Sequence, residues 1–152
     1  MATGEVMAIG NSFEAALLKG VRSLEIKQFT LMREFSKQHS LEGLKRRVVV
    51  PDDERLFDLA ELIRRDYLME KICEITGMDP WFIKKIKKIV EKEEELKEYS
   101  IETLTPEKLR EYKVMGFADE GIAEIIGCMG KDVRKLREKY NIRPVYKMVD
   151  TC

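Results

Sequence analysis

Two stretches of the chain repeat one pattern of residues fifty positions apart, and this repeat limits what the chain can fold into. The stretches are residues 67–77 and 117–127. In each, an aromatic residue, an isoleucine, a glutamate, a second isoleucine and a glycine follow in the same order. A further run with helical spacing comes after each copy, at residues 81–98 and 131–140. Two helices joined by a glycine turn, used twice, predict a small helical packing module whose function depends on what it contacts.

The length and composition of the chain predict one folded domain without a net charge. The chain has 152 residues, of which 44% are hydrophobic and 37% are charged, so it is long and apolar enough to bury a core. Its 28 basic and 28 acidic residues give a formal net charge of zero. This balance argues against a large nucleic-acid surface, and it leaves little repulsion to oppose association of the chain with itself.

Cysteine and histidine are too few and too scattered for a zinc site. The three cysteines, Cys73, Cys128 and Cys152, form no CxxC pair, and His39 is the one histidine. Cys73 and Cys128 fall in helical patterns and are interpreted as small core residues. This usage favours a reducing, cytoplasmic location. No apolar run approaches the roughly 20 residues of a membrane span, so we expect no membrane partner.

The two ends of the chain are predicted to be extended. Residues 3–10 form a short apolar run that predicts a strand, and residues 144–149 form a second extended run. A lone strand leaves its backbone groups unpaired, so both ends look like parts of larger sheets. Asn11 or Ser12 can cap the helix after the first run. We expect the inner face of that helix to carry Phe13, Ala16, Leu17, Val21 and Leu24.

Residues from 52 onward give clear helix signals. A first helix is predicted to break at Asp66, and Gly77 suits a left-handed helix end. Asp79 and Thr105 each stand before a proline, which is typical of a helix start. The sequence therefore predicts an all-α, irregular helical domain of about seven helices, with two helix-turn-helix-like repeats and short extended ends. The expected core anchors are Trp81, Tyr67, Phe117, Ile72 and Ile122. For the tryptophan, an interface role is the alternative.

The segment of residues 27–47 fits either a short helix or a mobile connection. It carries more apolar side chains than a short irregular segment can bury alone. We therefore expect it to provide a surface for self-association, in which helix faces pair across a two-fold axis. The candidate residues are Phe29, Leu31, Met32, Phe35 and Leu41.

No group of residues predicts catalysis, and nucleic-acid binding is the alternative function. Adjacent carboxylates at residues 52–54 and 93–95 point in different directions along a helix, and His39 has no nucleophile nearby. We expect no catalytic, cofactor-binding or metal-binding residue in this chain. The repeat order would suit a DNA-binding helix-turn-helix. Glutamates at residues 91–95 offset the lysines at 84–88, however, which disfavours a phosphate-binding track.

Four motifs stand out: TGEVMAIG at residues 3–10, DPWF at 79–82, GFAD at 116–119 and RPVYKMVDTC at 143–152. They closely resemble segments of the large chain of carbamoyl phosphate synthetase. Their order also matches, and the resemblance covers essentially the whole chain. The similar segment is the helical oligomerisation domain between the two ATP-grasp halves. One departure is Asn11-Ser12, where the family usually has an arginine followed by a threonine or a similar residue.

The resemblance implies an excised, non-catalytic domain. Residues 1–26 would end the carboxyphosphate half, residues 27–142 would form the oligomerisation domain, and residues 143–152 would lead into the carbamoyl-phosphate half. The parent makes carbamoyl phosphate from bicarbonate, glutamine-derived ammonia and ATP, for arginine and pyrimidine synthesis. Its ATP, magnesium or manganese, and potassium sites would lie in the ATP-grasp halves. The implied partners are those halves, a second copy of the chain and, only through the parent, the glutaminase small chain. A fragment that still binds nucleotide would need a glycine-rich phosphate loop, and the sequence has none.

Overall fold

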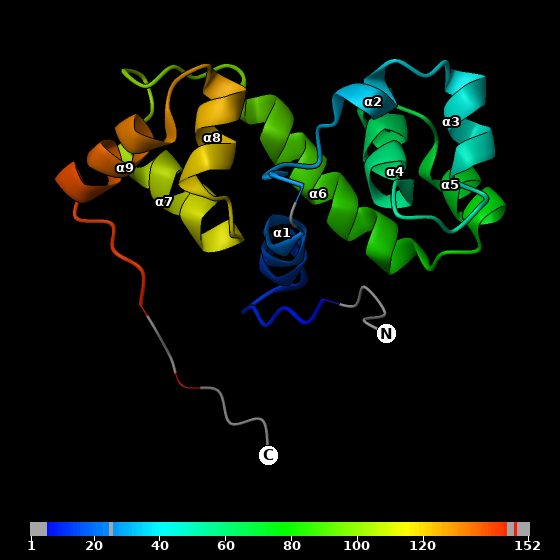
Figure 1. Ribbon diagram of the computed structural model, residues 1–152, viewed down its shortest axis with the longest axis horizontal. Coiled ribbons are helices and arrows are strands. Elements are labelled where there is room, and N and C mark those ends of the chain that lie inside the picture. Colours follow the sequence, from blue (N-terminus) through cyan, green and yellow to red (C-terminus); the bar gives the residue numbers. More distant parts are fainter. Residues whose placement is uncertain (1–5, 25, 146–147, 149–152) are drawn as a thin grey trace.

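All regular structure in this computed structural model is helical, within the residues that it describes, which are 6–24, 26–145 and 148. Figure 1 shows two lobes on either side of the long helix α6, with α1 crossing between them. Helices α2 to α5 form one lobe, and α7 to α9 form the other. The bounds are α1 Phe13–Ser23, α2 Glu34–Lys37, α3 Leu41–Arg47, α4 Arg55–Arg64, α5 Met69–Thr76, α6 Pro80–Leu96, α7 Pro106–Met115, α8 Asp119–Ile126 and α9 Gly130–Lys139.

The all-α prediction is confirmed, and the number of helices is higher than expected. Nine helices lie in the described part of the chain, against about seven predicted. The two additional helices are α2 and α3. Both come from the segment 27–47, which the sequence pattern left open between a helix and a mobile connection.

The strand expected at residues 3–10 does not form where the structure describes it. Residues 3–5 lie outside the described ranges, and residues 6–10 are neither strand nor helix. This segment instead lies against α1, where the Lys19 ammonium donates to the carbonyl oxygen of Ile9 at 3.3 Å. Of the extended run expected at 144–149, the described residues 144, 145 and 148 have no regular structure. A single strand lacks a neighbour to complete its hydrogen bonds, which explains both observations.

The repeat seen in the sequence extends to three helices in the structure. Helices α5 and α8 begin and end fifty positions apart, and α6 and α9 begin fifty positions apart. The preceding helices α4 and α7 also end alike. The amide of Tyr67 donates to the carbonyl of Leu62, and the amide of Phe117 to that of Tyr112, both at 3.1 Å. Each of these bonds spans five residues and closes a left-handed helix end.

The predicted helix boundaries are confirmed at the caps. Gly77 ends α5 at a φ of 67°, in the left-handed region that glycine favours. The Asp79 carboxylate accepts from the amide of Trp81 at 2.7 Å and so caps α6. The Thr105 hydroxyl does the same for α7 through the amide of Lys108, at 3.3 Å. Ser12, one of the two predicted caps, accepts from the amide of Ala15 at 3.2 Å.

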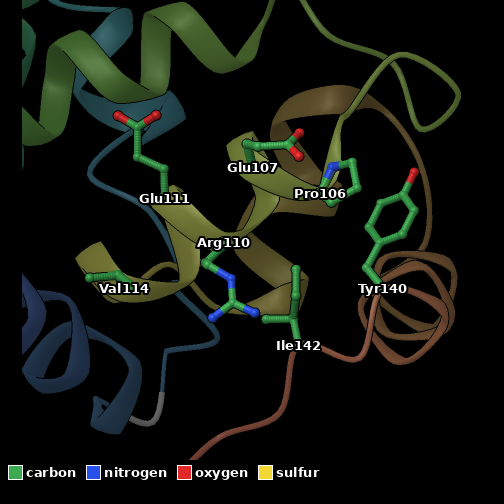
Figure 2. Close-up of a pocket in the computed structure, with 7 residues that line it drawn as sticks. All are labelled: Pro106, Glu107, Arg110, Glu111, Val114, Tyr140 and Ile142. Atoms are coloured by element: carbon green, nitrogen blue, oxygen red, sulfur yellow. The ribbon is translucent and has the colours of Figure 1, made fainter.

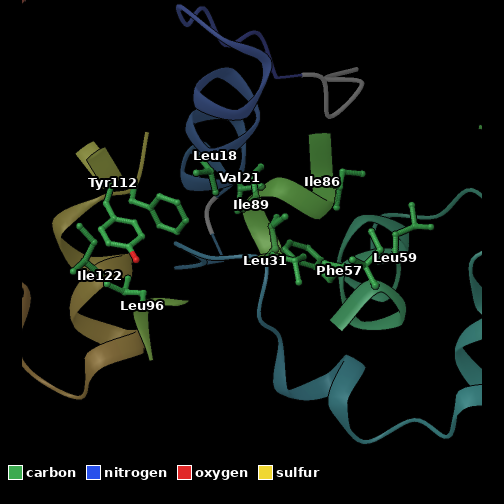
Figure 3. Packing of buried hydrophobic residues seen from close by; sticks show 14 of the residues in the cluster. Leu18, Val21, Leu31, Phe57, Leu59, Ile86, Ile89, Leu96, Tyr112 and Ile122 are labelled. Carbon is green, nitrogen blue, oxygen red and sulfur yellow. The ribbon is translucent and has the colours of Figure 1, made fainter. Parts of the chain in front are cut away.

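The core follows α6 from one lobe to the other. Figure 3 shows buried side chains of α1 and of both lobes meeting along this helix. Of the predicted anchors, Phe117, Ile72 and Ile122 are fully buried, and Tyr67 is half-buried against the core. Lys45 covers the Tyr67 ring, with its ammonium 4.8 Å from the ring centre.

The buried face of α1 is shifted from the predicted one. Leu18, Val21 and Glu14 are buried, whereas the predicted Phe13, Ala16, Leu17 and Leu24 are only half-buried; Val21 alone belongs to both sets. The buried positions lie three and four residues apart and form one stripe that faces α6. Glu14 is tolerated there because Lys85 and Lys88 of α6 each approach its carboxylate at 3.3 Å.

Helix α1 also packs closely on the end of α7. The Arg22 guanidinium donates to the carbonyl oxygen of Gly116 at 2.6 Å. Gly116 has a φ of 104°, and a Cβ atom placed there would lie 2.7 Å from the Cα of Ala15. Both the backbone conformation and the lack of space therefore require glycine at this position.

We expect Gly116→Ala to lower the free energy of unfolding by roughly 2–4 kcal/mol, because strain at positive φ and overpacking against α1 add together. Gly77→Ala is the matched control. Its φ is also positive, but a Cβ there meets nothing within 4 Å, so the expected loss is about 1 kcal/mol. Urea unfolding followed by circular dichroism measures both losses. Equal losses would show that the α1–α7 contact adds nothing to the backbone strain.

Candidate association surfaces

The buried carboxylate of Glu93 in α6 fixes the position of the segment 27–47. Its Oε1 atom accepts the amide hydrogen of Leu31 at 2.6 Å, and the Arg64 guanidinium of α4 donates to its Oε2 atom. The Glu93 and Leu31 side chains are both 0% exposed. A buried polar group needs hydrogen-bond partners, and both oxygens of the Glu93 carboxylate have one. The Leu31–Glu93 hydrogen bond therefore holds the connection between α1 and α2 against the core.

The five predicted association residues divide between core and surface. Leu31 lies in the core and can affect association only through folding. Phe29 and Met32 are half-buried. Phe35 in α2 and Leu41 in α3 remain 46% and 38% exposed. Phe35 and Leu41 are therefore the most exposed of the five predicted residues, and of these two Phe35 is the one that lines a hollow.

Phe35 belongs to a surface hollow that reaches both lobes. The hollow has a volume of about 520 Å³ and includes Ile26, Met32 and Phe35, together with Glu124 from α8. The ring of His39 lies edge-on to the Phe35 ring, 4.8 Å between centres, and the Arg47 guanidinium lies 5.0 Å from the Phe35 ring centre. These contacts hold the ring in place while leaving it open to solvent. We call Ile26, Met32 and Phe35 the α2 surface.

A second exposed apolar surface is formed by three aromatic rings at the starts of α1 and α6. Trp81 is 49% exposed and Phe82 is 42% exposed, so Trp81 is not the core anchor that the sequence predicted. Phe13 lies edge-on to both rings, with centres 5.2 and 5.5 Å away, and the Trp81 and Phe82 centres are 5.0 Å apart. Trp81 is exposed because α6 buries the stripe through Ile83 and Ile86 instead. We call Phe13, Trp81 and Phe82 the aromatic surface.

A groove beside α7 carries no catalytic arrangement. The groove has a volume of about 530 Å³ and lies between α7 and the residues that end and follow α9. Figure 2 shows the side chains that line it. Arg110, Glu107 and Glu111 line it beside apolar side chains, and the hydroxyl of Tyr140 donates to the carbonyl of Leu104 at 3.4 Å. The groove holds no nucleophile paired with a base. Within the described ranges, no three side chains of His, Cys, Asp or Glu type are close enough together to hold a metal ion.

Cys73, Cys128 and three lysines of α6 have structural roles. Cys73 and Cys128 are half-buried against the core, and burial raises the pKa of the Cys128 thiol, which makes it a poor nucleophile. Lys85 and Lys88 pair with Glu14, and Lys87 pairs with Glu91. These lysines are neutralised within the chain rather than aligned for phosphates, which removes the main support for DNA binding. None of the described helices is long and apolar enough to cross a membrane.

Comparison with known proteins identifies the family. Residues 5–141 match the family described as "Carbamoyl-phosphate synthetase large chain, oligomerisation domain". The chain belongs to this family. Its whole length is 54% identical to a carbamoyl phosphate synthase large chain from Clostridium botulinum (strain Loch Maree / Type A3), 52% to one from Clostridium beijerinckii and 47% to one from Clostridium perfringens (strain 13 / Type A). The chain spans about 14% of the length of these relatives. The resemblance drawn from the four sequence motifs is therefore confirmed.

The Glu93 contact should make the stability of this domain depend on pH. Burial raises the pKa of Glu93 from 4.5 to about 7, against the opposing effects of Arg64 and the Leu31 amide. The native state then binds more protons than the unfolded state between about pH 4.5 and 7. We expect the free energy of unfolding to fall as pH rises through this window, by up to about 1.4 kcal/mol per pH unit, and the fall to stop above pH 7.

Urea unfolding at pH 5, 6, 7 and 8 measures this slope. Glu93→Gln should make the slope much shallower, because the amide does not titrate; Glu124, whose pKa burial also raises, keeps a smaller part of it. Glu91→Gln changes an exposed carboxylate of the same helix and should leave the slope unchanged. An unchanged slope in Glu93→Gln would mean that another group titrates.

Proposed function

We propose that this domain is non-catalytic, that it holds the two ATP-grasp halves of the large chain in place, and that it supplies part of a contact between two large chains. Membership of the oligomerisation-domain family supports this proposal. The observation that carries the association role is the α2 surface. It leaves Phe35 46% exposed, although Glu93 holds the backbone of Leu31, four residues earlier, against the core.

A preformed surface favours association because little order has to be gained on binding. The Leu31 amide and the core side chain of Leu31 fix the segment before α2. The Arg65 guanidinium of α4 donates to the carbonyl of Lys37 at 2.8 Å and to that of His39 at 2.7 Å, which fixes the segment after α2. In a two-fold contact the same surface on both chains meets itself, so one exposed phenylalanine contributes twice.

The chemistry proposed for the parent takes place outside this domain. The parent forms carbamoyl phosphate from bicarbonate, glutamine-derived ammonia and ATP, and supplies arginine and pyrimidine synthesis. ATP, magnesium or manganese, and potassium act in the ATP-grasp halves in this proposal. The glutaminase small chain is a partner of the parent rather than of this domain.

Phe35→Glu tests the association role. We expect the dissociation constant of the dimer to rise at least tenfold, because a carboxylate in a two-fold contact faces a second copy of itself. Light scattering on a sizing column, over roughly a hundredfold range of concentration, measures the mass of each species. Val114→Glu is the control, because Val114 is also an exposed apolar residue but lies in α7, in the other lobe. An identical mass profile for Phe35→Glu and the unaltered chain would exclude the α2 surface.

A further inference from the structure

Positive charge collects around one large hollow, although the net charge of the chain is zero. The hollow has a volume of about 760 Å³ and is lined by the start of α1, by α6, α7 and α9, and by the segment that follows α9. Its lining includes six basic side chains and two acidic ones. The basic side chains are Lys88, Lys92, Arg110, Lys113, Arg137 and Arg143. We call this hollow the basic cleft.

The two carboxylates that line the basic cleft already have cationic partners. Glu14 is approached by Lys85 and by Lys88, each at 3.3 Å. The Glu111 carboxylate lies 2.5 Å from the Lys92 ammonium. Neither carboxylate is therefore an unpaired negative charge that would repel an anion from the cleft.

A third carboxylate, Asp119, is shared by two of the remaining cations. Its Oδ1 atom accepts from the Lys113 ammonium at 2.7 Å, and its Oδ2 atom accepts from the Arg137 guanidinium at 3.1 Å. One positive charge is therefore left over at this partly buried group. Burial lowers the pKa of Lys113, and the nearby Arg137 and Arg22 lower it further, as an excess of positive charge does.

Two further cations of the basic cleft have no carboxylate partner within the described ranges. Arg110 of α7 and Arg143 after α9 are exposed, and neither forms an ion pair with a described residue. Figure 2 shows the Arg110 guanidinium beside Ile142, an apolar side chain that also lines the cleft. Asn11 and Ser12 line it as well, so the positive end of the α1 dipole adds to the charge there.

We propose that the basic cleft binds a small anion that carries two or more phosphate groups. Its volume is in the range of small-molecule sites, which is roughly 300–1,000 Å³. Guanidinium groups bind phosphate oxygens through two parallel hydrogen bonds, and several unneutralised cations favour an anion with more than one charge. The cations line a concave hollow rather than a track along the surface, which favours a small anion over a nucleic acid. The inference does not depend on the proposed function, because the α2 surface shares no residue with the cleft.

Acetylation of lysines in the intact large chain, measured by mass spectrometry with and without pyrophosphate, tests the proposal. Lys88 lines the cleft and the adjacent Lys87 does not, although their side chains are similarly exposed, at 59% and 52%. Pyrophosphate should slow the acetylation of Lys88 at least fivefold and leave that of Lys87 unchanged, because a bound anion covers only the cleft. An unchanged rate at Lys88 would overturn the proposal. Equal slowing of both lysines would also overturn it, because that result is a general effect of salt.

Arg110→Gln gives a second measurement in the intact large chain. The pyrophosphate concentration that half-protects Lys88 should rise at least fivefold, because the variant lacks one of the unpaired guanidinium groups. Arg46→Gln is the matched control, because Arg46 is an exposed arginine of α3 that does not line the cleft. Equal protection of Lys88 in the two variants would contradict the proposal.

Two further probes identify the source of the phosphate groups. Tripolyphosphate and ATP are titrated against Lys88 acetylation in the same way. Tighter binding of ATP would assign a nucleotide, whose base can contact apolar side chains of the cleft such as Val114 and Ile142. Equal affinities would assign a free polyphosphate. Protection of Lys88 by duplex DNA but not by pyrophosphate would overturn the proposal in favour of a nucleic-acid surface.

Discussion

A single buried carboxylate determines how the irregular half of this domain is arranged. Glu93 lies inside the core, where an unpaired charge would cost several kcal/mol. It is stabilised by the Leu31 amide from an irregular connection and by Arg64 from α4. Each partner satisfies a group that would otherwise be buried without a hydrogen bond, so the three segments hold one another in place. The position of α2, and with it the exposed Phe35, depends on this arrangement.

Local chemistry made much of the helical part predictable. Asp79, Thr105 and Gly77 act through neighbours only a few residues away, so sequence spacing is enough to place the helix ends. The repeat was visible because its aromatic and isoleucine positions face the core in both copies. Its third helix was harder to see, because Asp66 takes the left-handed position at the end of α4 that Gly116 takes at the end of α7. Two different residues there hide a shared backbone conformation.

The association surfaces were less predictable because long-range contacts create them. The pattern of residues 27–47 could not show that Leu31 would enter the core, since its partner Glu93 is 62 positions away. Trp81 was expected in the core because large aromatic residues are usually buried in small domains. Its exposure depends on which side of α6 faces α4 and α5. The adjacent Phe82 is also large and apolar, so the local sequence does not indicate which side that is. For both residues, the deciding neighbour is distant in sequence.

Helix α6 also relates the orientations of the two lobes. It contacts α4 and α5 at one end and α8 at the other, and its 17 residues have a helical length of about 26 Å. Each residue of an α-helix advances the direction of a side chain by about 100°. One residue inserted midway would therefore turn one lobe by roughly a quarter of a circle relative to the other. Leu96 and Ile83 both point into the core now, and after the insertion they could no longer do so together. The length of α6, as much as its residue types, therefore sets the relative orientation of the two lobes and of any molecules bound to them.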